Sequence, residues 1–194
     1  MIVDGYHGTT RDRAESIIQT SMRESQRDGL WLGTGRYFFQ DARSLALHWA
    51  SKEIRRLNLT NPPAVVHARI DLSHCIDLAD NIFWTRVKEV YEDIAEGLTS
   101  RGIIQLGFEA NLRALTADEQ TRLGRNVVDA QVMTAARQSI VRDYRTLGVE
   151  LTAIRAAFAE GQPVHPTSWL FDESNIMICV IDPTALVSPL TILE

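Results

Sequence analysis

Three stretches of this 194-residue chain combine residue types that could do chemistry at the ends of short strands. The first covers residues 6–10 (YHGTT), in which His7 can exchange a proton and Gly8 lets a ligand approach the backbone. The second covers residues 32–39 (LGTGRYFF), where two glycines precede a tyrosine and two phenylalanines. The third covers residues 168–180 and ends in an apolar strand. Each stretch alone is as typical of a turn or of buried aromatic residues as of a binding site.

The spacing of other residues argues against several familiar sites. Gly33 and Gly35 precede a strand instead of a helix, so they lack the context of a dinucleotide-binding or phosphate-binding loop. The histidines have no zinc-like spacing with Cys75 or Cys179, and we therefore expect no metal site. Because both cysteines lie in apolar, strand-like segments, we expect buried free thiols, with a disulfide as the alternative.

Helices and short strands must position these stretches. Continuous or alternating apolar runs predict strands, and apolar residues three or four apart predict helices. Strands and helices follow one another without a regular βαβ rhythm, which favours an α+β fold. Residues 149–160 fit either a strand or a helix. The predicted strands cover residues 2–7, 37–39, 66–72, 175–181 and 186–193, and the predicted helices begin after Thr10, at a cap on Asp41, at residue 83 and after residue 124.

Size, net charge and hydropathy argue against several classes of protein. A chain with 45% hydrophobic and 23% charged residues suits one globular domain, residues 1–194. The formal net charge of −5 argues against a general nucleic-acid binder. The first residues lack an export signal, and no apolar run reaches the ~18–20 residues that span a membrane. We therefore expect a cytoplasmic protein that does not enter a membrane.

The order of the motifs resembles the ADP-ribosyltransferase superfamily. An HGT motif before an amphipathic helix, a GxGxYF motif and then an alanine-rich helix are similar to its His-Tyr-Glu branch, which includes diphtheria-like toxins and poly(ADP-ribose) polymerases. The likeness is greatest to small prokaryotic proteins with YHGT and WLGxGxYF motifs, and it extends over residues 126–133, 154–161 and 176–183. This resemblance implies a split, bent mixed β-sheet with surrounding helices, and a helical elaboration at about residues 83–124.

The same resemblance implies roles for individual residues around NAD⁺, the cofactor consumed as a substrate. His7 would bond the adenosine ribose, and the Gly8 backbone would approach the nicotinamide carboxamide. Tyr37 would stack on the nicotinamide ring, because an aromatic wall holds it rigidly for glycosidic cleavage. Trp49, or the adjacent His48, would form the opposite wall. The other residues of the two motifs that we expect to bind the cofactor are Thr9, Gly35 and Phe38.

The third family position departs from the pattern. Where the family has a glutamate or glutamine early in the late strand, this chain has Met177, and a thioether cannot replace a carboxylate. Three interpretations stay open. Met177 could line a pocket that works by positioning alone, a nearby polar group (Glu173 as the catalytic candidate, or Asn175) could take over, or the domain could be catalytically silent.

The resemblance implies an enzyme that transfers ADP-ribose from NAD⁺ to a macromolecular acceptor, which could be protein, RNA or DNA. The prokaryotic likeness further implies a toxin or a phage-defence effector, with a neutralising antitoxin protein as partner. Two other hypotheses stand beside this one. The chain could be a silent module that binds NAD or ADP-ribose and regulates a partner, a reading that Met177 favours. An RNA 2′-phosphotransferase shares the fold but needs several arginines and histidines in its pocket, and only His7 is evident here.

Overall fold

The computed structural model describes residues 1–25, 30–100 and 117–193. The chain divides into two compact units. The first unit comprises residues 1–25, 35–79 and 151–194, and the second comprises residues 26–34 and 80–150. The sequence predicted a single domain with a helical elaboration.

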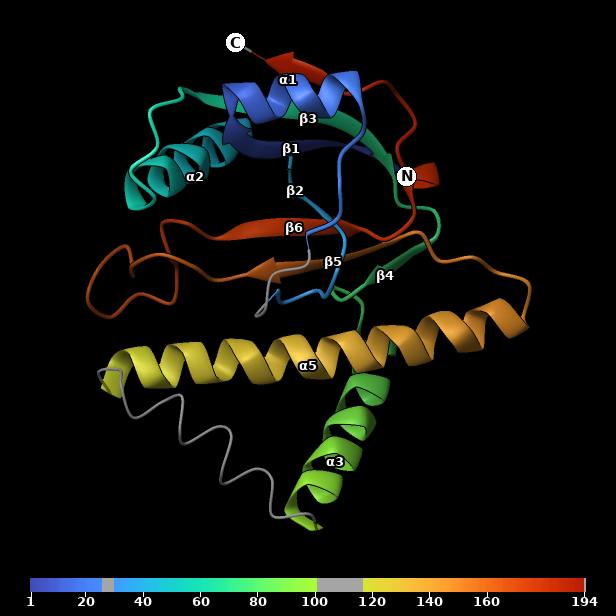
Figure 1. Ribbon diagram of the computed structural model, residues 1–194. Coiled ribbons are helices and arrows are strands. Elements are labelled where there is room, and N and C mark those ends of the chain that lie inside the picture. Colours follow the sequence, from blue (N-terminus) through green and yellow to red (C-terminus); the bar gives the residue numbers. More distant parts are fainter. Residues whose placement is uncertain (26–29, 101–116, 194) are drawn as a thin grey trace. The chain divides into compact units, whose positions relative to one another are not determined.

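The first unit is built on one seven-stranded mixed sheet with the strand order β4-β5-β6-β2-β1-β3-β7 (Figure 1). Neighbouring strands are antiparallel except β4 and β5, which are parallel. Together with the helices, this sheet confirms the predicted α+β class. The strands are β1 (Ile2–Thr10), β2 (Arg36–Gln40), β3 (Pro63–Asp71), β4 (Cys75–Asp77), β5 (Ala153–Phe158), β6 (Asn175–Val180) and β7 (Thr191–Leu193).

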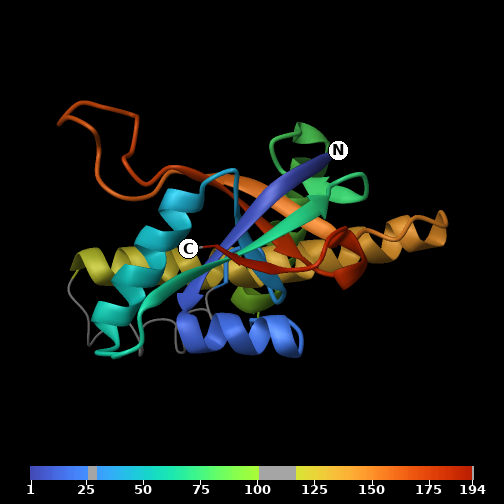
Figure 2. The same cartoon turned by 90° about the horizontal axis from the view of Figure 1, so that it is seen from above.

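Two helices cover opposite faces of the β1–β3 part of this sheet. Ala14 of α1 (Arg11–Gln19) packs with Val66, whereas Ala46 of α2 (Arg43–Arg56) packs with Val65. Because successive strand residues point to opposite faces, Val65 and Val66 place the two helices on different sides. In Figure 2 the paired strands β1 and β3 run between these helices.

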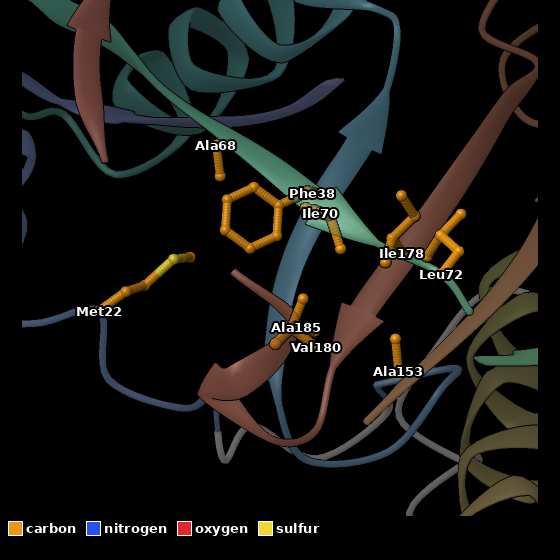
Figure 3. Packing of buried hydrophobic residues seen from close by; sticks show 9 residues of the cluster. All are labelled: Met22, Phe38, Ala68, Ile70, Leu72, Ala153, Ile178, Val180 and Ala185. Atoms are coloured by element: carbon orange, nitrogen blue, oxygen red, sulfur yellow. The ribbon is translucent and has the colours of Figure 1, made fainter. Parts of the chain in front are cut away.

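One apolar cluster lies on the α1 side of the sheet, and Figure 3 shows its buried residues. Phe38 and Ile70 meet at its centre, where they are 1% and 0% exposed. Gly5 makes room for both, because a Cβ atom there would lie 2.5 Å from Ile70 Cδ1 and 3.1 Å from Phe38 Cβ. Truncating a phenylalanine in such a site costs about 3–5 kcal/mol. The cluster comprises Met22, Phe38, Ala68, Ile70, Leu72, Ala153, Ile178, Val180 and Ala185.

Strands β1 and β2 share a short junction. Their register consists of Gly5↔Gln40 and Tyr6↔Phe39, whereas β1 pairs with β3 along its whole length. On the other side, β2 pairs with β6 from Arg36 to Phe39. Among the described residues, the registered pairing of β1 with β2 therefore ends at Tyr6, and His7 is the first residue beyond it.

The second unit contains helices. A single 3₁₀ turn, η1 (Asn81–Phe83), leads into α3 (Trp84–Ser100), and α5 spans Ala117–Thr146. Arg86 of α3 donates to Ser139 Oγ of α5 through Nη2 at 2.5 Å. The predicted elaboration covered residues 83–124. Of this range, residues 101–116 lie outside the described part of the chain.

Three sequence predictions of element boundaries need adjustment. The ambiguous segment 149–160 contains strand β5. The predicted last strand, residues 186–193, is shorter: β7 begins at Thr191, after a 3₁₀ turn, η2 (Pro183–Ala185), and an isolated bridge from Leu186 to Ile70 of β3. The prediction that Asp41 caps α2 is wrong: Ala42 occupies that position, while Asp41 has a φ of 52° and donates its backbone N–H to Asp4 O. Among the helices of the described residues, none is both long and apolar enough to cross a membrane.

Candidate functional site

The structure brings His7 and Tyr37 together at the point where β1 and β2 part. The Nδ1 atom of His7 lies 2.9 Å from the main-chain oxygen of Tyr37. A carbonyl oxygen only accepts, so Nδ1 carries the hydrogen, and in the neutral ring Nε2 is then an acceptor. The His7 ring also meets Phe38 edge-on, with ring centroids 6.1 Å apart. The first two motifs therefore converge through a side chain of one and the backbone of the other.

The motif glycines allow close packing around this point. A Cβ atom on Gly8 would overlap the main-chain carbonyl of Ala46 in α2 and lie 3.2 Å from Ala50 Cβ. A Cβ atom on Gly35 would overlap Cys179 Sγ and lie 2.8 Å from Val180 O. Gly8 was predicted to let a ligand approach the backbone. The structure adds a packing reason for glycine at that position, since α2 itself comes this close.

The first half of the second motif belongs to the second unit. Gly33 has a φ of 77°, which is strained for any residue with a side chain. Arg137 of α5 is 8% exposed, and its Nη1 donates to the main-chain oxygens of Leu32 and Thr34. This buried arginine holds the glycine turn in shape. Nothing in the sequence motif points to it.

Trp49 and Met177 meet in an apolar cluster on the α2 side of the sheet. Both pack against Phe39, Ala46 and Val65. The rings of Trp49 and Phe39 are 6.1 Å apart. The Trp49 Nε1 atom is buried and has no hydrogen-bond partner among the described residues. A buried donor without an acceptor costs about 1–3 kcal/mol.

Glu173 lies against α2 instead of pointing freely into solvent. Lys52 Nζ lies 3.2 Å from each carboxylate oxygen of Glu173, and His48 Nε2 lies 3.3 Å from Oε1. The Glu173 side chain is 19% exposed, while those of His48 and Lys52 are 50% and 48% exposed. Lys52 Nζ also stands 5.2 Å from the centroid of the Trp49 ring. We call Glu173, His48 and Lys52 the carboxylate cluster.

The chain immediately before β6 fixes the backbone at Glu173. Asn175 is 8% exposed, and its Nδ2 donates to Glu160 Oε2 at 2.9 Å and to Glu173 O at 3.0 Å. Its Oδ1 is buried without a partner among the described residues. Gly161 adopts a φ of 85°, and a Cβ atom there would lie 2.9 Å from Glu173 Cβ. The Asn175 side-chain amide therefore stabilises this segment through its bonds to Glu160 and Glu173.

Other residues singled out from the sequence lie elsewhere. Phe38 belongs to the core, where its side chain packs against other apolar groups. Thr9 is half-buried on β1 opposite Ala64. Arg155 of β5 donates to Asp77 Oδ2 at 2.6 Å and to Gln40 Oε1 at 3.0 Å. The bond from Arg155 lowers the pKa of Asp77 below its usual value.

Both cysteines are free thiols. Burial, with a smaller contribution from the charge of Asp77, raises the pKa of Cys75 to about 12, so this thiol is unreactive near neutral pH. Among the described residues, no three or more histidine, cysteine or acidic side chains gather as a metal site would require.

Comparisons with protein-family models, curated proteins and solved structures found no match. The functional argument therefore depends on the geometry of this chain.

Sequence reasoning named His48 only as a substitute wall, and it did not pair Lys52, a member of a basic cluster with Arg55 and Arg56, with a carboxylate. The signal that could have found them is their spacing, because residues four apart lie on the same helix face. Their partner Glu173 is 121 residues away from Lys52. Its position against α2 depends on how the segment before β6 folds, which no local pattern specifies.

Proposed function

We propose that this chain is an ADP-ribosyltransferase, which transfers ADP-ribose from NAD⁺ to a macromolecular acceptor and releases nicotinamide. The observation that carries the proposal is the bond from His7 to the Tyr37 carbonyl, made where β1 parts from β2. It places the two motif residues on adjoining strands at a break in the registered pairing. That arrangement fits a split, bent sheet of ADP-ribosyltransferase type, which we propose for the fold.

The residues present fit the chemistry of NAD⁺ cleavage in part. Loss of nicotinamide passes through an oxocarbenium-like state, so the enzyme must hold the ring and the ribose rigidly. Tyr37 and Trp49 would hold the nicotinamide ring. His7 Nε2 would accept a hydrogen bond from a ribose hydroxyl. NAD⁺ as a substrate is compatible with these roles.

The surroundings of Met177 and Glu173 favour positioning over direct charge stabilisation at the sugar. Met177 packs among apolar groups and offers no oxygen. The Glu173 carboxylate is held by Lys52, and to act on the ribose it would have to leave that partner. We therefore assign Glu173 an indirect role, through the histidine beside it.

NAD⁺ binding and turnover test the proposal. At a ligand concentration of 100 times the dissociation constant, binding stabilises the folded state by about 2.7 kcal/mol, which a thermal shift detects. Incubation with labelled NAD⁺ and a cell extract, followed by protease or nuclease digestion, reports whether ADP-ribose is transferred and to what. A folded sample without a thermal shift at millimolar NAD⁺ would refute the proposal.

One observation favours a second candidate, a silent module that binds NAD or ADP-ribose and regulates a partner protein. Met177 lies at the position where the ADP-ribosyltransferases that the sequence resembles have a glutamate or a glutamine, and its neighbours are apolar. If the wild type and Met177→Glu both bind NAD⁺ without releasing nicotinamide, this candidate replaces the enzyme. A toxin or defence role with a neutralising partner also stays a prediction from the resemblance.

A further inference from the structure

We propose that His48 is the general base that accepts a proton from the acceptor, that Glu173 is its positioning residue, and that the acceptor is a hydroxyl group of a protein. This inference rests on the proposed transfer of ADP-ribose. It concerns the carboxylate cluster of the first unit, in which His48 Nε2 lies 3.3 Å from Glu173 Oε1.

The chemistry of their side chains distinguishes the two partners of Glu173 in the cluster. Lys52 Nζ bonds both carboxylate oxygens and, as an ammonium, has no lone pair to accept a proton. An imidazole can accept a proton near neutral pH. If the neutral ring of His48 carries its hydrogen on Nε2, which lies 3.3 Å from Glu173 Oε1, its acceptor is Nδ1. A carboxylate that orients a histidine in this way is the usual partner of a catalytic base, and the distances are often loose without substrate.

The exposed position of His48 suits a general base that acts on a macromolecular acceptor. Its side chain is 50% exposed, so a group on another protein can reach the ring. The next residue, Trp49, packs with Met177 in the apolar cluster that we expect to face the nicotinamide. The charged groups in contact with His48 in the cluster are Glu173 directly and Lys52 through that carboxylate. The base therefore stands between the expected sugar position and the surface.

The reaction balances with one proton released. The acceptor hydroxyl gives its proton to His48 Nδ1, and its oxygen forms a bond with ribose C1′. The bond from C1′ to the nicotinamide nitrogen breaks, and its electron pair stays on that nitrogen, which neutralises the pyridinium. His48 then passes the proton to water. A carboxylate acceptor is already deprotonated at neutral pH and would need no such base.

The surface beside the cluster favours a protein over a nucleic acid. The segment that ends at Glu173 exposes Trp169, Leu170 and Val164 by 93%, 72% and 62%. Residues 159–174 contain no lysine or arginine, whereas phosphate backbones require basic side chains. Backbone bonds from Val164 N to Leu170 O at 2.9 Å and from Asp172 N to Gln162 O at 3.0 Å brace this segment. An apolar, acidic segment of this kind suits contact with another protein.

His48→Gln is the central test, since glutamine keeps a polar group beside Glu173 but cannot act as a base. We expect label transfer to protein to fall by on the order of 10²–10⁴, with NAD⁺ binding unchanged in a thermal shift. The loss should appear in kcat, with little change in KM for NAD⁺, because the base acts only in the chemical step. Added imidazole should restore part of the activity of His48→Ala. His74→Gln removes an exposed histidine outside the cluster and should behave like the wild type.

Glu173→Gln tests the positioning role. It should lower kcat by less than His48→Gln does, and imidazole should not rescue it because His48 is still present. A merely structural role would change stability and NAD⁺ binding together and leave kcat per folded molecule unchanged.

The linkage identifies the acceptor class. The transferred label should resist neutral hydroxylamine, which cleaves esters of carboxylates, and should be removed by protease but not by nuclease. Wild-type activity in His48→Gln, a hydroxylamine-sensitive label or a nuclease-sensitive label would each overturn the inference while leaving the transferase proposal intact. Absence of nicotinamide release from NAD⁺ by the wild type would refute the proposed function, and this inference with it.

Discussion

The His7–Tyr37 contact and the carboxylate cluster are held by different kinds of interaction. The first is a bond from a ring nitrogen to a main-chain oxygen, so its acceptor is fixed by the register of β2 with β6. The second joins exposed side chains of α2 to a residue before β6, across 121 positions of the sequence. Main-chain geometry survives most side-chain changes, whereas exposed ion pairs contribute only about 0–1 kcal/mol to stability. A side-chain substitution at Tyr37 should therefore leave this acceptor in place, and substitutions in the carboxylate cluster should change activity more than stability.

The largest effect should come from Tyr37. Tyr37→Ala removes the ring that we expect to hold nicotinamide, and turnover should fall by about 10²-fold or more because the substrate is no longer positioned. Tyr37→Phe keeps the ring and should keep most of the activity. Nicotinamide release per folded molecule, with circular dichroism as the check on folding, measures both. If Tyr37→Ala loses only stability, the tyrosine is a packing residue and not part of the site.

Gly8→Ala should be the most destabilising change at the strand junction. The added methyl group would overlap the Ala46 carbonyl, so α2 or β1 must shift. Overpacking of this type costs about 1–3 kcal/mol. The urea midpoint measures the loss, and Ala157→Gly, at an exposed position of β5, is a control for the general effect of exchanging these two residues. An unchanged midpoint would contradict the close approach of α2.

Lys52→Met should separate activity from stability in the carboxylate cluster. Without the ammonium, the Glu173 carboxylate loses two bonds, and we expect about a tenfold lower kcat while the unfolding free energy changes by less than about 1 kcal/mol. Lys88→Met, at an exposed position of α3, removes the chain's other lysine and is the matched control. Equal activities of the two variants would show that Lys52 does not matter for the site.

Met177→Gln tests whether positioning alone is enough. It restores a hydrogen-bonding group at the third family position, and activity should stay the same or rise. The half-buried amide among apolar neighbours should lower stability by about 1 kcal/mol. Rates at saturating NAD⁺, together with urea unfolding, report both effects. A strong loss of activity at full folding would mean that the thioether itself is needed.

The smallest expected effect concerns the half-buried pair that ties β5 to β4 and β2. Arg155 lowers the folded-state pKa of Asp77, so the pair adds stability above the unfolded pKa of about 3.9 and loses it as pH falls below that value. Between pH 5 and pH 3 the urea midpoint of the wild type should fall slightly more than that of Asp77→Asn. Parallel curves for the two proteins would show that the pair contributes nothing measurable.

The spacing of apolar residues along the sequence predicted many of the strands and helices. Strands β1, β2, β3 and β6 follow from continuous or alternating apolar residues, and the helix after Thr10 from its apolar spacing. The alanine-rich segment that became β5 was compatible with both states, because alanine favours helices while neighbouring strands favour extended backbone. The division into two compact units could not be predicted, since it depends on which distant segments pack together.

The site was predictable only where it follows the chain locally. His7 and Tyr37 were named from their motifs, and the structure places them in contact. The contacts of Lys52 with Glu173 and of Arg137 with the glycine turn, and the ordered position of Glu173, were not predicted. Each depends on a side chain that reaches a segment far along the sequence, and residue type alone does not reveal such a partner.

The two-pair junction between β1 and β2 has a mechanical consequence. A sheet resists bending and shear through the bonds that cross from strand to strand, so its softest line runs where fewest pairs cross. Here that line separates strands β7, β3 and β1 from strands β2, β6, β5 and β4. In the described part of the chain these two groups are registered to each other at two pairs, Gly5↔Gln40 and Tyr6↔Phe39. His7 lies on β1, in the first group of strands, and Tyr37 lies on β2, in the second group. Thermal bending at the junction of β1 and β2 would change the distance between the two motif residues, while the strands within each group keep their register.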